Sequence, residues 1–138
     1  MPGMIAADLR SDLIARGCCV EIHGDTDHLL AAQARTLRYL QTSIASATST
    51  DRYLKTYDSL MRVVESWLIR NSLRFGQSPH KGLSLILSAH LSESRELIDR
   101  LVSQRHRSKK DGEAPPQQSQ RELEMLYEST ISTFGSPV

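Results

Sequence analysis

The residues of this 138-residue chain best suited to chemistry form a basic run, Arg105-His106-Arg107-Ser108-Lys109-Lys110, which Asp111 follows. Four cations and a histidine fall within six residues with no acid among them, and such a cluster can hold phosphate groups. Histidine also supplies a side chain that can transfer protons near neutral pH. A solvated basic helix end that complements the helix dipole would give the same pattern, so charge alone does not decide between the two interpretations.

Two neighbouring cysteines and two nearby histidines lack the spacing of a metal site. Adjacent cysteines splay apart, and the separation of Cys18 and Cys19 from His23 and His28 fits no established zinc pattern. We expect two small, half-buried thiols instead. The chain also lacks a Gly-Lys-Ser/Thr phosphate loop, a Gly-x-Ser-x-Gly elbow and a His-Glu-x-x-His pair. We therefore expect no metal, no cofactor and no enzyme of the classes that these motifs mark.

The aromatic residues and the remaining histidines are better explained by packing than by chemistry. Trp67 has the helical periodicity of an apolar stripe, so we expect it, with Tyr53 and Tyr57, in a core rather than in a platform for stacked bases. His80 stands where a helix is expected to begin, and His90 near its end. We expect both histidines to be packed or capping residues.

Length and composition indicate one domain over residues 1–138. The near balance of charge gives no overall attraction to nucleic acid or to a membrane. The chain has 17 basic and 16 acidic residues and is 39% hydrophobic, and its length suffices for an independent core. Neither a signal peptide nor a membrane-spanning stretch is recognisable, and two adjacent cysteines cannot form a disulfide framework. We expect a cytoplasmic protein that does not enter a membrane.

The apolar residues recur at helical spacing, with no sustained strand-like alternation, which predicts an all-α fold. An N-terminal helix and connector fill residues 1–24, and the Pro-containing stretch 113–118 is expected to be a loop. Ser119 to Glu122 matches a capping box at the start of a final helix, 119–134. The stretch 80–111 is expected to form one kinked helix or two. The other expected helices span residues 4–16, 25–44 and 50–72.

Three segments follow one another in an order that resembles the HEPN (higher eukaryotes and prokaryotes nucleotide-binding) family, in its small bacterial or archaeal form. A helix led by Tyr57 precedes a turn into a helix led by His80, and the basic helix end at residues 99–112 follows. The similarity extends from about Leu29 to Ile131. It implies an antiparallel bundle of four to five helices, frequently a homodimer whose signature segments face each other across a two-fold axis and form a basic cleft.

The resemblance implies roles for residues near the helix end through a degenerate Arg-x4-6-His motif. Arg105 matches the arginine, whereas His106 falls where asparagine is common. Lys110 falls where tyrosine or the catalytic histidine stands, and Asp111 matches the aspartate of a Tyr-Asp variant. The late histidine is missing. A catalytic pair would therefore be Arg105 with His106, or Arg100 with His106 at a spacing that the motif allows.

The function implied by the resemblance is binding rather than catalysis. We expect a dimeric component of a HEPN and minimal nucleotidyltransferase module, of the toxin–antitoxin or defence type, that binds a protein partner, RNA or nucleotide. The alternatives are a metal-independent HEPN ribonuclease toxin and a non-catalytic helical adaptor. Neighbouring helical residues point about 100° apart, so Arg105 and His106 would need a frayed helix end or the partner protomer to act together. The expected binding residues are Arg105, Arg107, Lys109, Lys110 and Asp111.

Overall fold

The computed structural model describes residues 3–45 and 47–137 of the chain. The expected domain also includes residues 1, 2, 46 and 138, which lie outside the described part. The described residues form six helices and one two-stranded sheet, so the helical class is confirmed. Six is the higher of the two counts that the apolar pattern allows, and it exceeds the four to five helices that the resemblance implies. The elements are α1 (Ala7–Ala15), β1 (Cys19–Glu21), α2 (Asp27–Ile44), α3 (Ser49–Arg70), β2 (Leu73–Phe75), α4 (Pro79–His90), α5 (Arg95–Asp111) and α6 (Gln117–Phe134).

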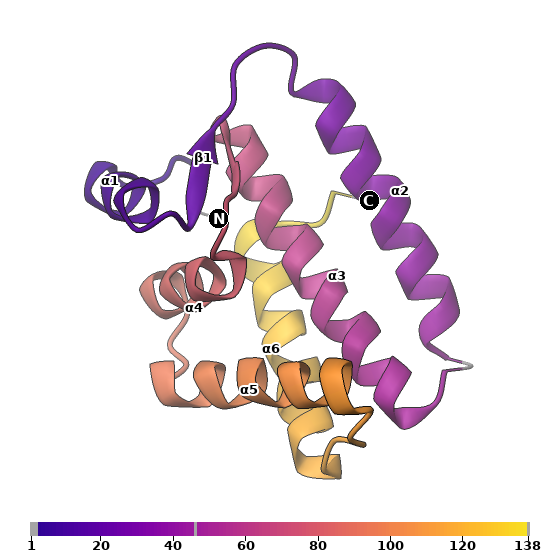
Figure 1. Ribbon diagram of the computed structural model, residues 1–138. Helices are drawn as coiled ribbons and strands as arrows, with labels where there is room; N and C mark the ends of the chain where they lie inside the picture. Colours follow the sequence, from indigo (N-terminus) through magenta and orange to yellow (C-terminus); the bar gives the residue numbers. More distant parts are fainter. Residues whose placement is uncertain (1–2, 46, 138) are drawn as a thin grey trace.

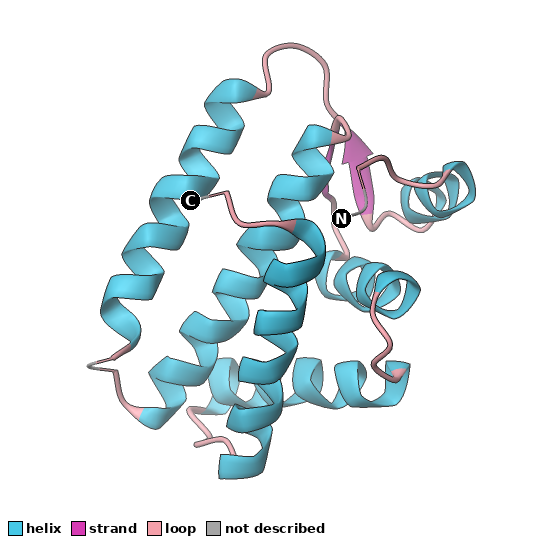
Figure 2. Ribbon diagram, turned by 180° about the vertical axis from the view of Figure 1, so that it is seen from behind, coloured by secondary structure: helices cyan, strands magenta, loops and turns pink. Residues whose placement is uncertain are grey.

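Helices α2, α3 and α6 lie side by side, and α5 crosses near one end of α3 and α6 (Figures 1 and 2). The chain reverses between α2 and α3, which are antiparallel. Helices α3 and α6 are parallel, because Arg52 pairs with Glu124 near their starts and Arg70 donates to the carbonyl of Phe134 near their ends. The antiparallel arrangement expected for the bundle is therefore wrong for this pair.

Helix α3 is the central element of the core. Its apolar positions carry fully buried side chains, among them Trp67 at 1% exposure and Tyr53 at 0%. The Trp67 ring lies edge-on to Phe134 of α6 and to His90 of α4, at centroid distances of 5.0 and 5.1 Å. The expected core positions of Trp67, Tyr53 and Tyr57 are confirmed, and the packing of His90 agrees with its expected role.

Helices α3 and α5 begin with side-chain caps, and α5 ends at a glycine. The hydroxyl of Thr48 accepts from the Asp51 N–H at the start of α3, and that of Ser94 accepts from the Leu97 N–H at the start of α5. The Ser94 cap separates α4 from α5, so the stretch 80–111 forms two helices. Gly112 ends α5 in the left-handed conformation, at φ 69°, as a C-cap glycine does.

The start of the final helix differs from the sequence-based expectation. Helix α6 begins directly after Pro116, so the expected loop at 113–118 is shorter and Ser119 lies within the first turn. Glu122 does not complete a capping box, because its carboxylate pairs instead with Arg100 of α5. Pro116 occupies the N-cap position, and α6 starts without a side-chain hydrogen bond from that residue.

A small antiparallel sheet, which the sequence did not predict, supports the turn that leads into α4. Cys19 of β1, which lies in the expected connector, pairs with Phe75 of β2. Three-residue strands are too short to produce a detectable alternation. Gly76 follows β2 so closely against β1 that an added Cβ would lie 2.8 Å from the Gly17 carbonyl oxygen. This close packing fixes where α4 begins.

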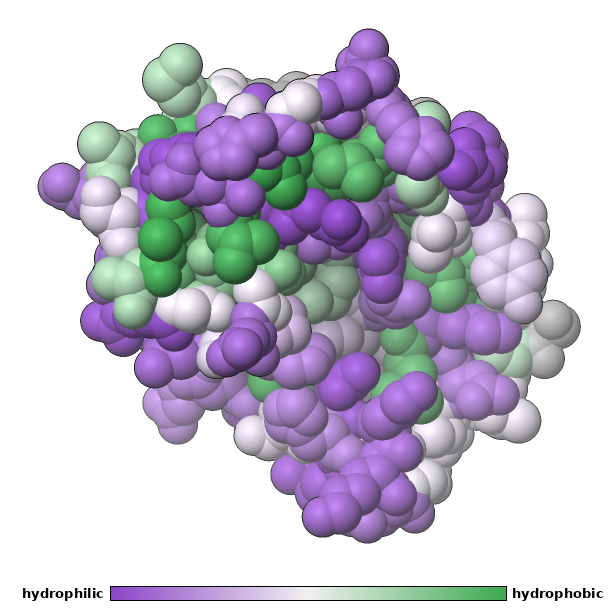
Figure 3. Space-filling model, turned by 45° about the horizontal axis from the view of Figure 1, so that its top comes forward, coloured by the Kyte–Doolittle hydropathy of each residue, from purple (hydrophilic) through white to green (hydrophobic). Residues whose placement is uncertain are grey.

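One face of the molecule is mainly hydrophilic. Figure 3 shows this face, on which hydrophobic side chains emerge in small patches between hydrophilic ones. In residues 3–45 and 47–137, no helix combines the length and the apolar composition needed to cross a membrane. The large hydrophobic side chains that are most exposed in this part of the chain are Met4, Val20, Tyr39 and Met125.

Candidate functional site

A pocket of about 590 Å³ lies between α2, the part of α3 from Asp51 to Glu65, the turn from β2 into α4, and the last turns of α5. The volume is in the range of small-molecule binding sites. The pocket draws on segments that are far apart in the sequence. Its polar lining residues are Asp51, Lys55, Tyr57, Asp58, Arg62, Glu65, His80, Arg105 and Lys109, and its apolar ones include Leu40, Met61 and Phe75.

A hydrogen-bonded tyrosine–histidine pair forms one wall of the pocket. The hydroxyl oxygen of Tyr57 lies 2.8 Å from Nδ1 of His80, the second residue of α4. Burial raises the pKa of the Tyr57 phenol, so the hydroxyl keeps its proton. Burial, together with the charge of Arg105 and with His106, lowers the pKa of His80 to about 4. We therefore assign the phenol as donor to Nδ1 of a neutral imidazole, whose own proton is then on Nε2.

Arg105 and His106 approach this pair from α5. The guanidinium carbon of Arg105 lies 5.8 Å from the centre of the Tyr57 ring, within cation–π distance. The His106 ring stands edge-on to the His80 ring at 4.9 Å between centroids. Helix α5 is regular through both residues, so neither a frayed end nor a partner protomer is needed to bring them to one place. The Arg105 and His106 side chains point in different directions, as expected. Arg105 contacts Tyr57 and His106 contacts His80, so both meet the same hydrogen-bonded pair.

Three cations border the pocket without a carboxylate partner. Lys55 of α3, Arg105 and Lys109 line it, and within the described residues none of them forms an ion pair. Arg105 and Lys109 are four positions apart in α5 and so lie on one face of the helix. Asp51 is the acid in the lining that is likewise unpaired among the described residues. This side of the pocket therefore carries a net positive charge.

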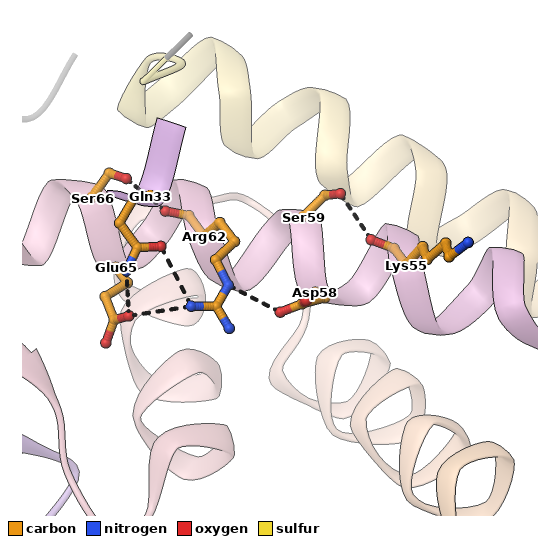
Figure 4. A network of polar contacts seen from close by, with 7 residues as sticks. All are labelled: Gln33, Lys55, Asp58, Ser59, Arg62, Glu65 and Ser66. Carbon is orange, nitrogen blue, oxygen red and sulfur yellow. Dashed lines mark hydrogen bonds and ion pairs between the residues drawn. The ribbon is translucent and has the colours of Figure 1, made fainter. Parts of the chain in front are cut away.

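The other two acids of the pocket belong to a polar network around Arg62 (Figure 4). The Arg62 guanidinium donates to Asp58 at 3.1 Å and to the Gln33 side-chain oxygen at 3.5 Å, and lies 3.8 Å from Glu65. The Glu65 carboxylate also accepts from the Gln33 amide at 2.9 Å and from the Phe75 N–H at 3.1 Å. The network joins α2, α3 and β2, and Arg62 offsets one of the two carboxylate charges. The lining as a whole therefore has four cations, Lys55, Arg62, Arg105 and Lys109, against the three acids Asp51, Asp58 and Glu65.

Two of the arginines singled out from the sequence form ion pairs within the protein and do not line the pocket. Arg107 donates to Glu113 at 3.0 Å and to the Gln104 side-chain oxygen at 2.9 Å. Hydrogen bonds from Arg107 and then Gln104 lower the pKa of the Glu113 carboxyl. Arg100 donates to both carboxylate oxygens of Glu122 at 2.9 and 2.8 Å, which ties α5 to α6. These contacts occupy both guanidinium groups.

The residues predicted from the sequence near the end of α5 do not all face the pocket. Lys110 and Asp111 are exposed at its end and do not line the pocket. Of the five expected binding residues, Arg105 and Lys109 therefore reach the site and the other three do not. Of the two expected catalytic pairs, Arg105 with His106 meets at the Tyr57–His80 pair. The alternative with Arg100 is not assembled, because that arginine is bound to α6.

Sequence reasoning assigned Tyr57 and His80 to packing and overlooked Lys55 as a site residue. The signal that could have found the pair is the phenol on an otherwise apolar stripe, because a buried tyrosine hydroxyl requires a polar partner. The histidine beside Pro79, at the start of the next helix, could have supplied that partner. Lys55 has no comparable signal, because a lone lysine one turn from a helix start is ordinary.

The cysteines are structural. Cys18 and Cys19 are free thiols at 0% and 1% exposure, more deeply buried than expected. Burial raises the pKa of both thiols, that of Cys19 to about 12, which keeps them protonated and unreactive. Within the described residues, no group of three or more histidine, cysteine or acidic side chains is arranged to hold a metal ion.

Comparisons of the chain with protein-family models, with curated proteins and with solved structures find no match. The chemistry of the pocket must therefore be inferred from its own geometry. Unpaired cations beside a neutral hydrogen-bonding pair suit an anion whose oxygens accept several hydrogen bonds.

Proposed function

We propose that this chain is a HEPN-like protein whose pocket binds the phosphate groups of RNA or of a nucleotide. The observation that carries the proposal is the position of Lys55, Arg105 and Lys109 around one pocket, without carboxylate partners among the described residues. Phosphate oxygens accept charge-assisted hydrogen bonds from lysine and arginine, and arginine can contact two oxygens at once. The Nε2–H of His80 would add a neutral donor.

The convergence of three separate segments supports the HEPN-like interpretation. The segments that carry the resemblance begin at Tyr57, at Pro79 and at Asp99, and residues from all three line the pocket or contact its wall. If the segments were only solvated helix ends, nothing would require them to meet. We accordingly propose a homodimer that functions with a minimal nucleotidyltransferase partner in the reducing cytoplasm.

Binding measurements with a matched lysine pair test the phosphate pocket. We expect Lys109→Ala to weaken the binding of labelled RNA, and Lys110→Ala to leave it near the wild-type value. Both lysines are exposed and lie in the last turn of the same helix, but only Lys109 lines the pocket. Each lost phosphate contact should also reduce the slope of log K against log salt by about 0.7 for single-stranded RNA. Equal effects of the two substitutions would contradict the proposal and favour a helical adaptor with a solvated basic end.

A second candidate function is metal-independent RNA cleavage. It is favoured by the contact of His106 with His80 beside Arg105, which places two imidazoles and a guanidinium within one cluster. In cleavage by internal transfer the 2′-hydroxyl gives up a proton and attacks phosphorus, while the departing 5′-oxygen takes up a proton. Both nitrogens of His80 are engaged, because Nδ1 accepts from Tyr57 and Nε2 carries the remaining proton. His106 would therefore accept the proton of the 2′-hydroxyl and return it to the departing 5′-oxygen, while Arg105 stabilises the phosphate charge.

The cleavage assay uses wild type and His106→Ala in the presence of a chelator. His106 is exposed, so its replacement should leave the fold intact. We expect cleavage by the wild type and a loss of at least about 100-fold in the variant, the usual lower range for general acid–base catalysis. Equal cleavage by both proteins, or by neither, would exclude His106 as a catalytic residue.

A further inference from the structure

Helix α2 has an outward flank that the proposed phosphate pocket does not use. Tyr39 is 69% exposed and is the one aromatic ring among the highly exposed hydrophobic residues of the described chain. Arg35 lies one helical turn before it, is exposed, and forms no ion pair within the described residues. The α2 sequence between His28 and Ile44 contains no acid, and the one acid of the helix, Asp27, lies about two turns before Arg35.

The geometry of α2 places this flank beside the pocket. Leu40 lines the pocket, and Gln33, two turns earlier, bonds to the Arg62 network in the same wall. Gln41 points about 100° to one side of Leu40 and donates to the Tyr127 hydroxyl of α6 at 3.3 Å. Tyr39 points about 100° to the other side, away from α6. Arg35, five residues before Leu40, points about 140° from it, so both side chains lie on the outward flank that adjoins the pocket-lining side at Leu40.

We infer that Tyr39 and Arg35 extend the pocket into a track for single-stranded nucleic acid. This inference rests on the proposed phosphate pocket. A strand whose phosphate lies between Arg105 and Lys109 would pass over the rim of α2, where one base stacks on the Tyr39 ring and Arg35 contacts the backbone. Aromatic platforms combined with cations along the backbone are the general means of binding single strands.

Other ligands fit this arrangement less well. A mononucleotide can fill the pocket without using the outer flank of α2. The bases of a duplex are stacked on each other and are not free to stack on a protein ring. A stable protein interface covers about 800 Å² on each partner with an apolar centre, whereas Tyr39 is a single ring among exposed polar side chains.

The test compares a fluorescently labelled single strand of about 10 nucleotides, within known single-strand site sizes, with a labelled nucleoside monophosphate. The variants are Tyr39→Ala and, as the matched control that keeps the ring, Tyr39→Phe. Loss of one stacked base should weaken binding of the oligonucleotide about 5-fold to 100-fold in Tyr39→Ala. Binding of the monophosphate should not change, and Tyr39→Phe should retain most of the affinity.

Three results would overturn the inference. Oligonucleotide binding that Lys109→Ala weakens and Tyr39→Ala does not would refute the track while leaving the phosphate pocket in place. A duplex that binds as tightly as the single strand would likewise refute the track and leave the phosphate pocket in place. Failure of both probes to bind the wild-type protein would refute the pocket and the track together.

Discussion

Acidification should destabilise this protein through His80, because the folded state favours the neutral imidazole. The environment of His80 consists of Tyr57 from α3 and Arg105 and His106 from α5. Burial, Arg105 and His106 lower its pKa to about 4, whereas a histidine in an unfolded chain titrates near 6.5. Between these two values the unfolded chain binds a proton that the folded chain does not. The free energy of unfolding is therefore highest above about pH 6.5 and decreases as the pH falls toward 4.

The pKa difference sets the size of this effect. One pKa unit corresponds to about 1.4 kcal/mol, so the difference between about 4 and 6.5 gives an upper limit of about 3 kcal/mol. His80 is only half-buried, and solvent screening reduces the interaction with the Arg105 charge. We expect about 1 to 2 kcal/mol of stability to be lost through this residue between pH 7 and pH 4.

Urea unfolding of wild type and His80→Gln across this pH range isolates the contribution, because all other titrating groups are common to both proteins. The stability difference between the two should change by the predicted amount, and the NMR titration of His80 should report its lowered pKa directly. Arg105→Ala should raise that pKa. Arg95→Ala is the matched control, since Arg95 lies ten residues earlier in α5, about 15 Å along the axis and beyond the screening length of about 8 Å. A His80 that titrates near 6.5 in the wild type would refute the reasoning.

Three further predictions concern the supports of the site. Glu65→Ala removes the acceptor of a backbone N–H and a glutamine amide and should cost about 3 kcal/mol in urea unfolding, whereas replacement of the exposed Glu128 should change stability by less than about 0.5 kcal/mol. Cys19, with its pKa raised to about 12, should react with an alkylating reagent at pH 7 only after denaturation; rapid reaction of the native protein would contradict its burial. Gly76→Ala should lower the unfolding midpoint by the equivalent of about 1 to 3 kcal/mol, because its Cβ would meet the Gly17 carbonyl at 2.8 Å, and an unchanged midpoint would show that this contact relaxes freely.

The helices were predictable where a long apolar stripe or a strong end signal marks them. The stripe that contains Trp67 predicted the central helix because burial of one face imposes the 3.6-residue period. The expected end at residue 111 is confirmed, because Gly112 adopts without steric cost the left-handed conformation that ends α5. The strands and the start of α6 were not predictable in this way. The strands are too short for a periodic signal, and Pro116 begins α6 where a capping box favoured Ser119.

The roles of the basic residues could be predicted only as a group. Arg105, Arg107 and Lys109 are alike in charge and nearly adjacent in sequence, and charge alone assigned them all to one ligand. Their different roles in the folded protein depend on which residues each side chain meets. Glu113, brought back by the turn after α5, binds Arg107, while Arg105 and Lys109 face the pocket.

The sequence by itself determined the helical class and the four-residue spacing that puts Arg105 and Lys109 on one face of a helix, because both follow from local backbone geometry. The tertiary structure alone decided that this face meets Tyr57 and His80, which are 23 residues apart and belong to different helices. Such a meeting depends on how α3, α4 and α5 pack against one another, and no local pattern specifies that packing. The basic segment thus became part of a pocket only when the chain folded around α3.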